Sequence, residues 1–168
     1  VSRFVGLSES LVVGHPMQPV FMGPVIDSHA KNSILRAVKN ASESGFENPL
    51  KMTEAKLEYE GHYLSPAVFT KDKMSLENVK TSQYLQAEIF GPETLIMGVD
   101  SLDSAIAIAN ASPFGLVGSV FTNSTDIFEE CWWELETGLV NWNKSTVGAS
   151  LKLPFGGVNH SGIGSSHG

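Results

Sequence analysis

The sequence has very little cysteine: Cys131 is the single one among 168 residues. This excludes a disulfide within the chain and suits a reducing compartment, so we expect a cytoplasmic protein. A zinc site is also disfavoured, because there is no second thiol and no two of the five histidines have the i, i+4 spacing of a helical metal pair. We therefore predict no metal.

Basic residues and long apolar runs are also scarce. Lysine and arginine number 11 against 18 acidic residues, a formal net charge of −7, and no basic cluster stands out. We therefore expect no nucleic acid partner. No apolar run approaches the ~20 residues that span a bilayer, and residues 1–10 lack the basic and apolar leader of a secretory signal. We expect no membrane partner, and the helical start and glycine-rich end suggest a piece of a longer protein.

The pattern that is present is that of a globular protein, with 42% hydrophobic and 17% charged residues. A helix is predicted near the start, and a longer one that Asp27 or Ser28 caps and Gly45 ends. Residues 46–62 are expected to be loop with one short strand, followed by an extended run that Pro66 breaks. The second half alternates in type: strand 94–100, helix 101–112, strand 115–122, helix 124–138 and strand 139–143.

This alternation with short connections predicts an α/β fold, in which a mostly parallel sheet has helices on both faces and forms three layers. We expect residues 1–168 to form a single domain. Ligands of such sheets gather where strands end.

The stretch QAEIFGPE, residues 86–93, places a carboxylate and an aromatic ring beside a sharp bend. Glu88 can accept two hydrogen bonds from a vicinal diol, each worth roughly 1.5–3 kcal/mol when the acceptor is charged. Phe90 can lie against a planar heterocycle. Together these are the requirements for binding a nicotinamide riboside. Taken alone, the two residues fit an ordinary loop better than a binding site.

Cys131 is the obvious candidate nucleophile by residue type. It lies in EECWWE, where neighbouring acids disfavour the thiolate, and helical spacing puts it on a buried face. We therefore interpret it as structural. The terminal GIGSSHG follows no strand and has no lysine, which predicts a turn and no phosphate-binding loop.

Five motifs in order carry a resemblance: FMGPVID, AEIFGPE, NASPFGLVGSVFT, GLVNWNKSTVGA and PFGGVNHSGIG. This series resembles the aldehyde dehydrogenase superfamily over about residues 3–164. The segments GLVNWNKSTVGAS and FEECWWELETG are most similar to N-succinylglutamate 5-semialdehyde dehydrogenases. Such enzymes oxidise that semialdehyde to N-succinylglutamate with NAD, in arginine breakdown.

The resemblance also implies what this chain lacks. It corresponds to the carboxyl-terminal part of a catalytic domain, so the nucleophilic cysteine, the general-base glutamate and the NAD-binding domain lie upstream. We therefore expect no catalytic residue within residues 1–168 and no turnover by the chain alone. Members of the family pair strands between subunits, so we expect a homo-oligomer. The residues that choose NAD or NADP usually lie in the absent domain.

The resemblance assigns roles to five residues. It implies that Glu88 holds the nicotinamide ribose hydroxyls, that Phe90 lies beside the nicotinamide, and that Phe155 is a pocket aromatic near the aldehyde substrate. Lys144 and Ser145 follow the strand whose end lines the substrate entrance. Our own hypothesis is that Lys144 attracts a substrate with several carboxylates; the alternative is a solvated lysine.

Two other functions remain open. The parent protein could be a dehydrogenase for another aldehyde or semialdehyde. The chain could instead be a non-catalytic interaction module that keeps the fold.

Overall fold

The computed structural model describes residues 1–148 and 154–162, arranged as two compact units. Unit 1 comprises Val1–Met74 and Ala87–Gly98, and unit 2 comprises Ser75–Gln86 and Val99–Gly168. Of the predicted terminal turn GIGSSHG, only Gly162 belongs to the described residues. The assignment of one domain stays a prediction.

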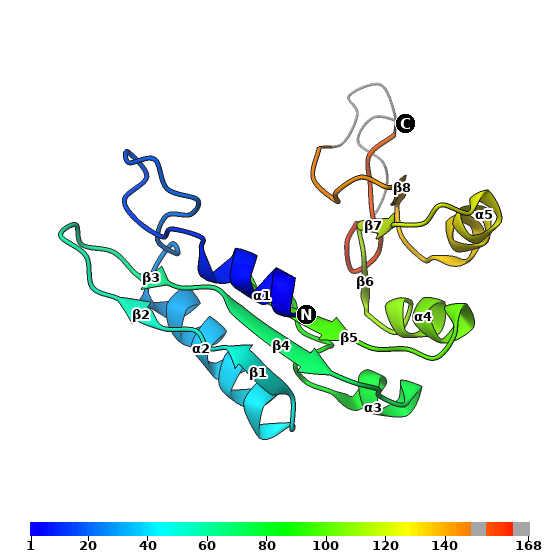
Figure 1. The fold of residues 1–168 in the computed structure, drawn as a ribbon, viewed down its shortest axis with the longest axis horizontal. Coiled ribbons are helices and arrows are strands. Elements are labelled where there is room, and N and C mark those ends of the chain that lie inside the picture. The colour runs from blue at the N-terminus through cyan, green and yellow to red at the C-terminus, as the bar shows by residue number, and fades with distance from the viewer. Residues whose placement is uncertain (149–153, 163–168) are drawn as a thin grey trace. The chain divides into compact units, whose positions relative to one another are not determined.

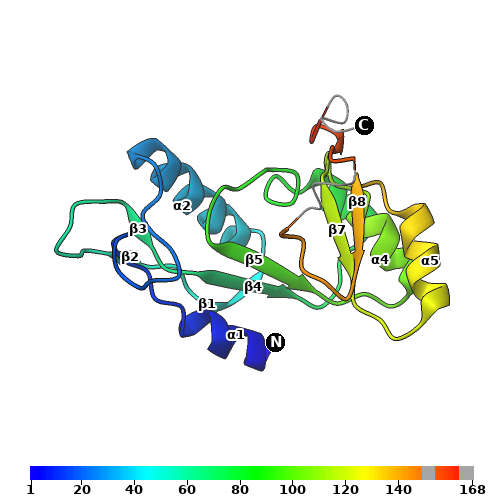
Figure 2. The same cartoon turned by 90° about the horizontal axis from the view of Figure 1, so that it is seen from above.

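Unit 1 is built on a three-stranded sheet in the order β1-β4-β5, with β1 at Glu47–Leu50, β4 at Ala67–Lys71 and β5 at Glu93–Met97. Strands β4 and β5 are parallel along their whole length, and β1 adds to β4 in the antiparallel direction. Helices α1 (Ser2–Glu9) and α2 (Ser28–Glu43) lie on opposite faces of this sheet (Figures 1 and 2). The layers are helix, sheet, helix, in agreement with the predicted α/β fold.

Helix α2 has the start and end that its sequence predicts. The Asp27 side chain accepts a hydrogen bond of 2.7 Å from the backbone N–H of Ala30, an N-cap worth about 1 kcal/mol. Ile34 and Ala41 are buried on its inner face. The helix stops before Gly45, whose φ of +77° lies in the left-handed region where glycine costs least.

The polar stretch after α2 contains more strand than predicted. Besides β1, the short strand β2 (Glu54–Ala55) pairs antiparallel with β3 (Tyr63–Leu64). Two-residue strands leave no periodic signal in a sequence, because their pairing depends on the partner strand. As predicted, Pro66 interrupts the extended run between β3 and β4.

Unit 2 contains three helices and four strands among its described residues. They are α3 (Leu76–Thr81), α4 (Leu102–Ala109), β6 (Phe114–Gly115), β7 (Val117–Val120), α5 (Thr125–Glu134), β8 (Leu139–Trp142) and β9 (Val158–Asn159). Strands β7 and β8 are parallel, and β6 pairs with β9 antiparallel. Helices α4 and α5 lie on one side of the β7–β8 pair (Figures 1 and 2). Phe128 of α5 stacks on Trp142 of β8, with ring centroids 4.8 Å apart.

Three features of unit 2 differ from the sequence prediction. Helix α3 was not predicted; Ser75 caps it by accepting a hydrogen bond from the N–H of Asn78. The single strand expected at 115–122 is split, because β6 pairs with β9 while β7 pairs with β8. Helix α5 ends at Glu134, before the predicted stop at Gly138.

The described helices include none with the length and apolar character needed to cross a membrane.

Candidate functional site

The bend that follows Glu88 and Phe90 is fixed by packing and by the backbone. The N–H of Ala67 in β4 donates to the carbonyl of Pro92 at 2.9 Å, which joins the bend to the sheet. A Cβ at Gly91 would come within 2.7 Å of Cγ2 of Ile34, so the bend packs directly on α2. Glycine is therefore required here for close approach.

A cavity of about 250 Å³ lies between α2 and the segment that leads into this bend. Its lining residues are His29, Ala30, Ser33, Ile34, Ala37, Ala87, Glu88, Ile89 and Phe90. The structure thus brings the two predicted coenzyme residues, Glu88 and Phe90, together at one concave site. Their predicted roles remain predictions.

Both residues are available to a ligand. Glu88 is exposed, and within residues 1–148 and 154–162 it makes no hydrogen bond or ion pair. Phe90 is 79% exposed, unusually open for a phenylalanine. The volume is below the roughly 300–1,000 Å³ of a pocket for a complete small ligand. The cavity therefore suits one part of a larger ligand.

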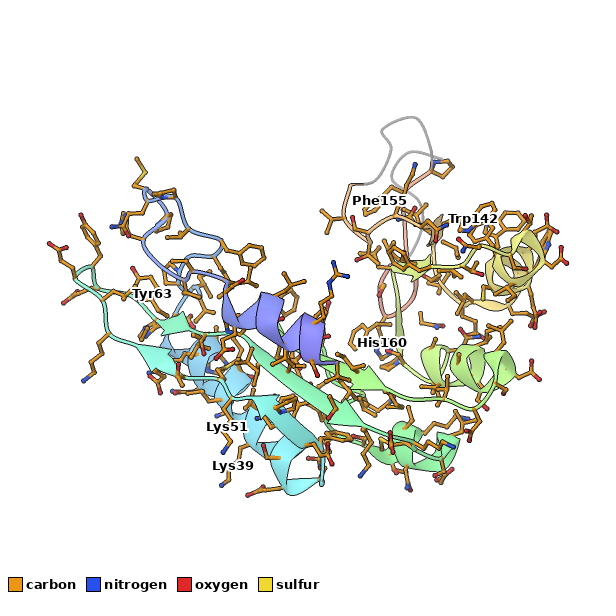
Figure 3. The ribbon with its side chains drawn as sticks, in the orientation of Figure 1. Lys39, Lys51, Tyr63, Trp142, Phe155 and His160 are labelled. Atoms are coloured by element: carbon orange, nitrogen blue, oxygen red, sulfur yellow. The ribbon has the colours of Figure 1, made fainter. Side chains whose placement is uncertain are left out.

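A second cavity in unit 1, of about 750 Å³, lies beside the β2–β3 hairpin. Two of its lining residues, Lys31 and Glu54, form an ion pair of 2.8 Å, so their charges offset each other. Tyr63 lines it and is 2% exposed, and its hydroxyl has no hydrogen-bond partner among the described residues (Figure 3). None of the residues predicted from sequence lines this larger cavity.

Lys144 and Ser145 lie together in unit 2, directly after β8. Their backbone carbonyls are held by side chains of neighbouring strands: Ser119 donates to Lys144 O, and Asn141 donates to Ser145 O at 2.9 Å. The side chain of Lys144 is exposed, and its amino group makes no ion pair within the described residues. The loop backbone is thus fixed while the charge of Lys144 faces solvent.

Phe155 also belongs to unit 2, in the segment that leads into β9, and it is half-buried (Figure 3). The chain just after β9 is tied to β6, because the N–H of Gly115 donates to the hydroxyl of Ser161 at 3.0 Å. The ring of His160 packs edge-on against Phe114, with centroids 5.8 Å apart. The predicted substrate-pocket residues Phe155, Lys144 and Ser145 therefore share one unit.

Cys131 is buried, as its sequence context predicts. It is 4% exposed on the inner face of α5. Burial, and then the charge of Glu130, raise the pKa of its thiol above the ordinary value. A buried, protonated thiol is a poor nucleophile. The described part of the chain also contains no group of three or more histidine, cysteine or acidic residues that could hold a metal ion.

Comparison with known proteins places this fold and these motifs in one family. The model of the aldehyde dehydrogenase family matches residues 1–168. The chain belongs to the aldehyde dehydrogenase family. It is 35% identical over 158 residues to N-succinylglutamate 5-semialdehyde dehydrogenase 1 of Caulobacter vibrioides, covering 93% of this chain and 31% of the relative.

Two further aldehyde dehydrogenases extend the comparison. Benzaldehyde dehydrogenase YfmT of Bacillus subtilis is 33% identical over 161 residues, 95% of this chain and 31% of that protein. The NAD⁺ complex of an aldehyde dehydrogenase from Bacillus cereus superimposes with a TM-score of 0.85 at 26% identity, over 99% of this chain and 33% of that one. The α/β aldehyde dehydrogenase fold is therefore confirmed. The chain spans about a third of the length of these relatives.

His29 and Ser33 were not among the residues predicted for the site of this aldehyde dehydrogenase chain. They line the cavity with Glu88, but from α2. A signal was present in the sequence, because two polar residues at i and i+4 share a helix face next to the apolar stripe of Ala30 and Ile34. What the sequence does not show is that this face meets the segment before Gly91.

Proposed function

We propose that this chain is part of the catalytic domain of an NAD-dependent aldehyde dehydrogenase, and that it holds the nicotinamide end of the coenzyme. The observation that carries the proposal is the cavity beside Glu88 and Phe90, at the motif on which the family resemblance rests. The NAD⁺ complex among the similar structures supports the choice of coenzyme.

The residues present fit this part of NAD. Glu88 has two free carboxylate oxygens for a ribose diol, and Phe90 offers an open ring face to a planar heterocycle. Bound NAD supplies the acceptor for the hydride that leaves the substrate. Glu88 would hold the ribose and Phe90 would lie beside the attached ring, so the two residues would orient the acceptor. Orientation of this kind lowers the entropic part of a reaction barrier.

We propose that the substrate is N-succinylglutamate 5-semialdehyde and that the parent enzyme oxidises it to the acid N-succinylglutamate. Support comes from the identity to the Caulobacter vibrioides enzyme and from the unpaired charge of Lys144 beside Ser145. The benzaldehyde dehydrogenase of Bacillus subtilis favours a second candidate, an aromatic aldehyde. The semialdehyde has carboxylates and benzaldehyde has none. The charge of Lys144 would therefore attract only the semialdehyde.

The chemical step is assigned to residues outside this chain, because Cys131 is buried and its thiol pKa is raised. We accordingly propose that the 168-residue chain mixed with NAD and semialdehyde forms no NADH. We further propose a cytoplasmic homo-oligomer for the parent enzyme. Formation of NADH by this chain alone would contradict the proposal, because the nucleophile would then lie within residues 1–168.

The proposal is tested by titrating the ¹⁵N-labelled chain with nicotinamide riboside and following amide shifts by NMR. Shifts are expected at Ala87–Phe90 and at the start of α2. Glu88→Gln removes the charge and one acceptor, and a loss of 1.5–3 kcal/mol weakens binding roughly tenfold or more. Glu58→Gln, an exposed acid in unit 1 that does not line the cavity, is the matched control. Absence of binding, or equal affinity of the Glu88→Gln and Glu58→Gln variants, would contradict the proposed function.

A further inference from the structure

The larger cavity of unit 1 has the size of a complete small-molecule site. Its volume of about 750 Å³ lies within the roughly 300–1,000 Å³ of pockets that hold small ligands. It is lined by Lys31 of α2 and by residues 54–63, which form the hairpin of β2 and β3. Its described lining shares no residue with the cavity of Glu88 and Phe90, so a ligand here is independent of the proposed coenzyme role.

Tyr63 places a buried polar group at this cavity. Its side chain is 2% exposed, and its hydroxyl has no hydrogen-bond partner among the described residues (Figure 3). The hydroxyl end of the ring lies beside Gly61, another lining residue, because a Cβ at Gly61 would be 2.8 Å from Cε2 and 2.9 Å from Cζ of Tyr63. A buried hydroxyl without a partner is destabilising, and an acceptor on a ligand would remove that cost.

The charged side chains of the lining leave one cation and one anion to bind a ligand. Lys31 and Glu54 are paired with each other. Lys56 and Glu60 are exposed, and neither makes an ion pair or a side-chain hydrogen bond within the part of the chain that the structure describes. A ligand with charge of one sign would face a like charge here, which disfavours it. A zwitterion matches both.

The hairpin that carries these groups is held in place before any ligand binds. Strands β2 and β3 pair antiparallel on either side of its loop. The N–H of Val25 donates to the carbonyl of His62 at 2.9 Å, which ties the end of the loop to the segment before α2. The ring of Tyr59 packs on that of His15, with centroids 4.3 Å apart. A site on a fixed backbone loses less conformational entropy when it binds.

We propose that this cavity binds a free α-amino acid with an uncharged side chain that ends in a hydrogen-bond acceptor. Glu60 binds the α-ammonium group, and Lys56 binds the α-carboxylate. The Tyr63 hydroxyl donates to the acceptor of the side chain. The ligand has no net charge, so the Lys31–Glu54 pair stays intact. Tyr63 therefore makes the site prefer a polar side chain over an apolar one of similar length.

The test titrates four probes into the ¹⁵N-labelled 168-residue chain and follows amide shifts by NMR. L-Glutamine carries all three groups. Glutaramic acid lacks the ammonium group, 4-aminobutanamide lacks the α-carboxylate, and L-norleucine has an apolar side chain. We expect L-glutamine to shift amides of residues 54–63 and to bind more tightly than each of the other three. Absence of L-glutamine binding, or equal affinity for all four probes, overturns the inference.

Two variants test the charged groups. Lys56→Gln should weaken L-glutamine binding by about 2- to 5-fold, the size of one exposed charge interaction, and leave 4-aminobutanamide binding unchanged. Glu60→Gln should weaken L-glutamine binding by the same factor and leave glutaramic acid binding unchanged. Lys51→Gln and Glu58→Gln, at exposed residues that do not line the cavity, are the matched controls. Equal effects of a variant and its control contradict the assigned roles.

Tyr63→Phe tests the buried hydroxyl. It should weaken L-glutamine binding by about 2- to 12-fold, the equivalent of one neutral hydrogen bond, and leave L-norleucine binding unchanged. Without ligand the variant should not have a lower midpoint of thermal unfolding, because the hydroxyl has no partner in the described chain. Equal weakening of both probes, or a lower midpoint, would show that the hydroxyl acts within the fold, and either result overturns its role in binding.

Discussion

The side chain of Asn143 bonds both backbone groups of Thr122. Its Oδ1 accepts from the Thr122 N–H at 2.9 Å, and its Nδ2 donates to the Thr122 carbonyl at 2.9 Å. Asn143 also has a φ of +51°, in the left-handed region that asparagine tolerates better than most residues. Asn143 therefore joins the ends of β7 and β8 and fixes the direction of the backbone that leads into Lys144.

We predict that Asn143→Ala destabilises the chain by about 1–3 kcal/mol, since it leaves two backbone groups without that partner and places an alanine at positive φ. Asn143→Gly should destabilise the chain less than Asn143→Ala. Both variants lose the hydrogen bonds, but glycine adopts the positive φ without strain. Urea denaturation followed by fluorescence measures both. Asn123→Ala, at an exposed asparagine nearby in sequence, is the control with little expected change. Equal stabilities of the Asn143→Ala and Asn123→Ala variants would contradict the role given to these bonds.

Two glycine-to-alanine substitutions should change stability in opposite directions. At Gly91 the new Cβ would lie 2.7 Å from Cγ2 and 2.9 Å from Cγ1 of Ile34, and overpacking of this kind costs about 1–3 kcal/mol. At Gly6, inside α1, a Cβ meets no atom within 4 Å, so alanine should stabilise the helix by roughly 0.5–1 kcal/mol. Thermal denaturation compares the two variants. Adding Gly91→Ala to an Ile34→Ala background should cost less than adding it to the unmodified chain, and full additivity would show that the clash is not with Ile34.

Raising the pH should destabilise the chain through Cys131. Burial and then Glu130 raise the pKa of the folded thiol above its ordinary value, while the unfolded thiol ionises at that ordinary pKa. The contribution of the protonated Cys131 thiol to the free energy of unfolding is complete below the pKa of the unfolded thiol. It is lost as the pH rises toward the pKa of the folded thiol. Urea unfolding at pH 7.5 and pH 10 should therefore show a larger loss for the unmodified chain than for Cys131→Ala. An identical loss in both would mean that the folded thiol titrates normally.

Lys144→Ala in the intact dehydrogenase should raise the KM for N-succinylglutamate 5-semialdehyde by about 2- to 5-fold, the size of one exposed charge interaction. The KM for benzaldehyde should not change, because that substrate has no carboxylate. The effect should shrink at high salt, where exposed charges are screened. Lys80→Ala, an exposed lysine on α3, is the control. An unchanged semialdehyde KM would leave Lys144 as a solvated lysine.

Local sequence patterns predict much of the secondary structure of this protein and one of its motifs. Asp27, the apolar face of α2 and Gly45 specify a helix through contacts within a few residues, and the structure has that helix. The acid and the ring of Glu88 and Phe90, followed by Gly91-Pro92, are likewise a local signal, and the two side chains do share a cavity. Short elements were missed, because α3 and the two-residue strands give too few residues for a period to show.

The tertiary structure decided where elements end and what meets the site. Asn110 donates to the carbonyl of Glu134 at 2.7 Å and accepts from the N–H of Glu136 at 2.9 Å, which ends α5 before Gly138. His29 and Ser33 line the cavity of Glu88 only because α2 packs on Gly91. Capping and periodicity act over one or two turns of chain, so the sequence by itself determined the motif and every described helix except the short α3. A partner from a distant segment is chosen by close packing, which no local pattern records.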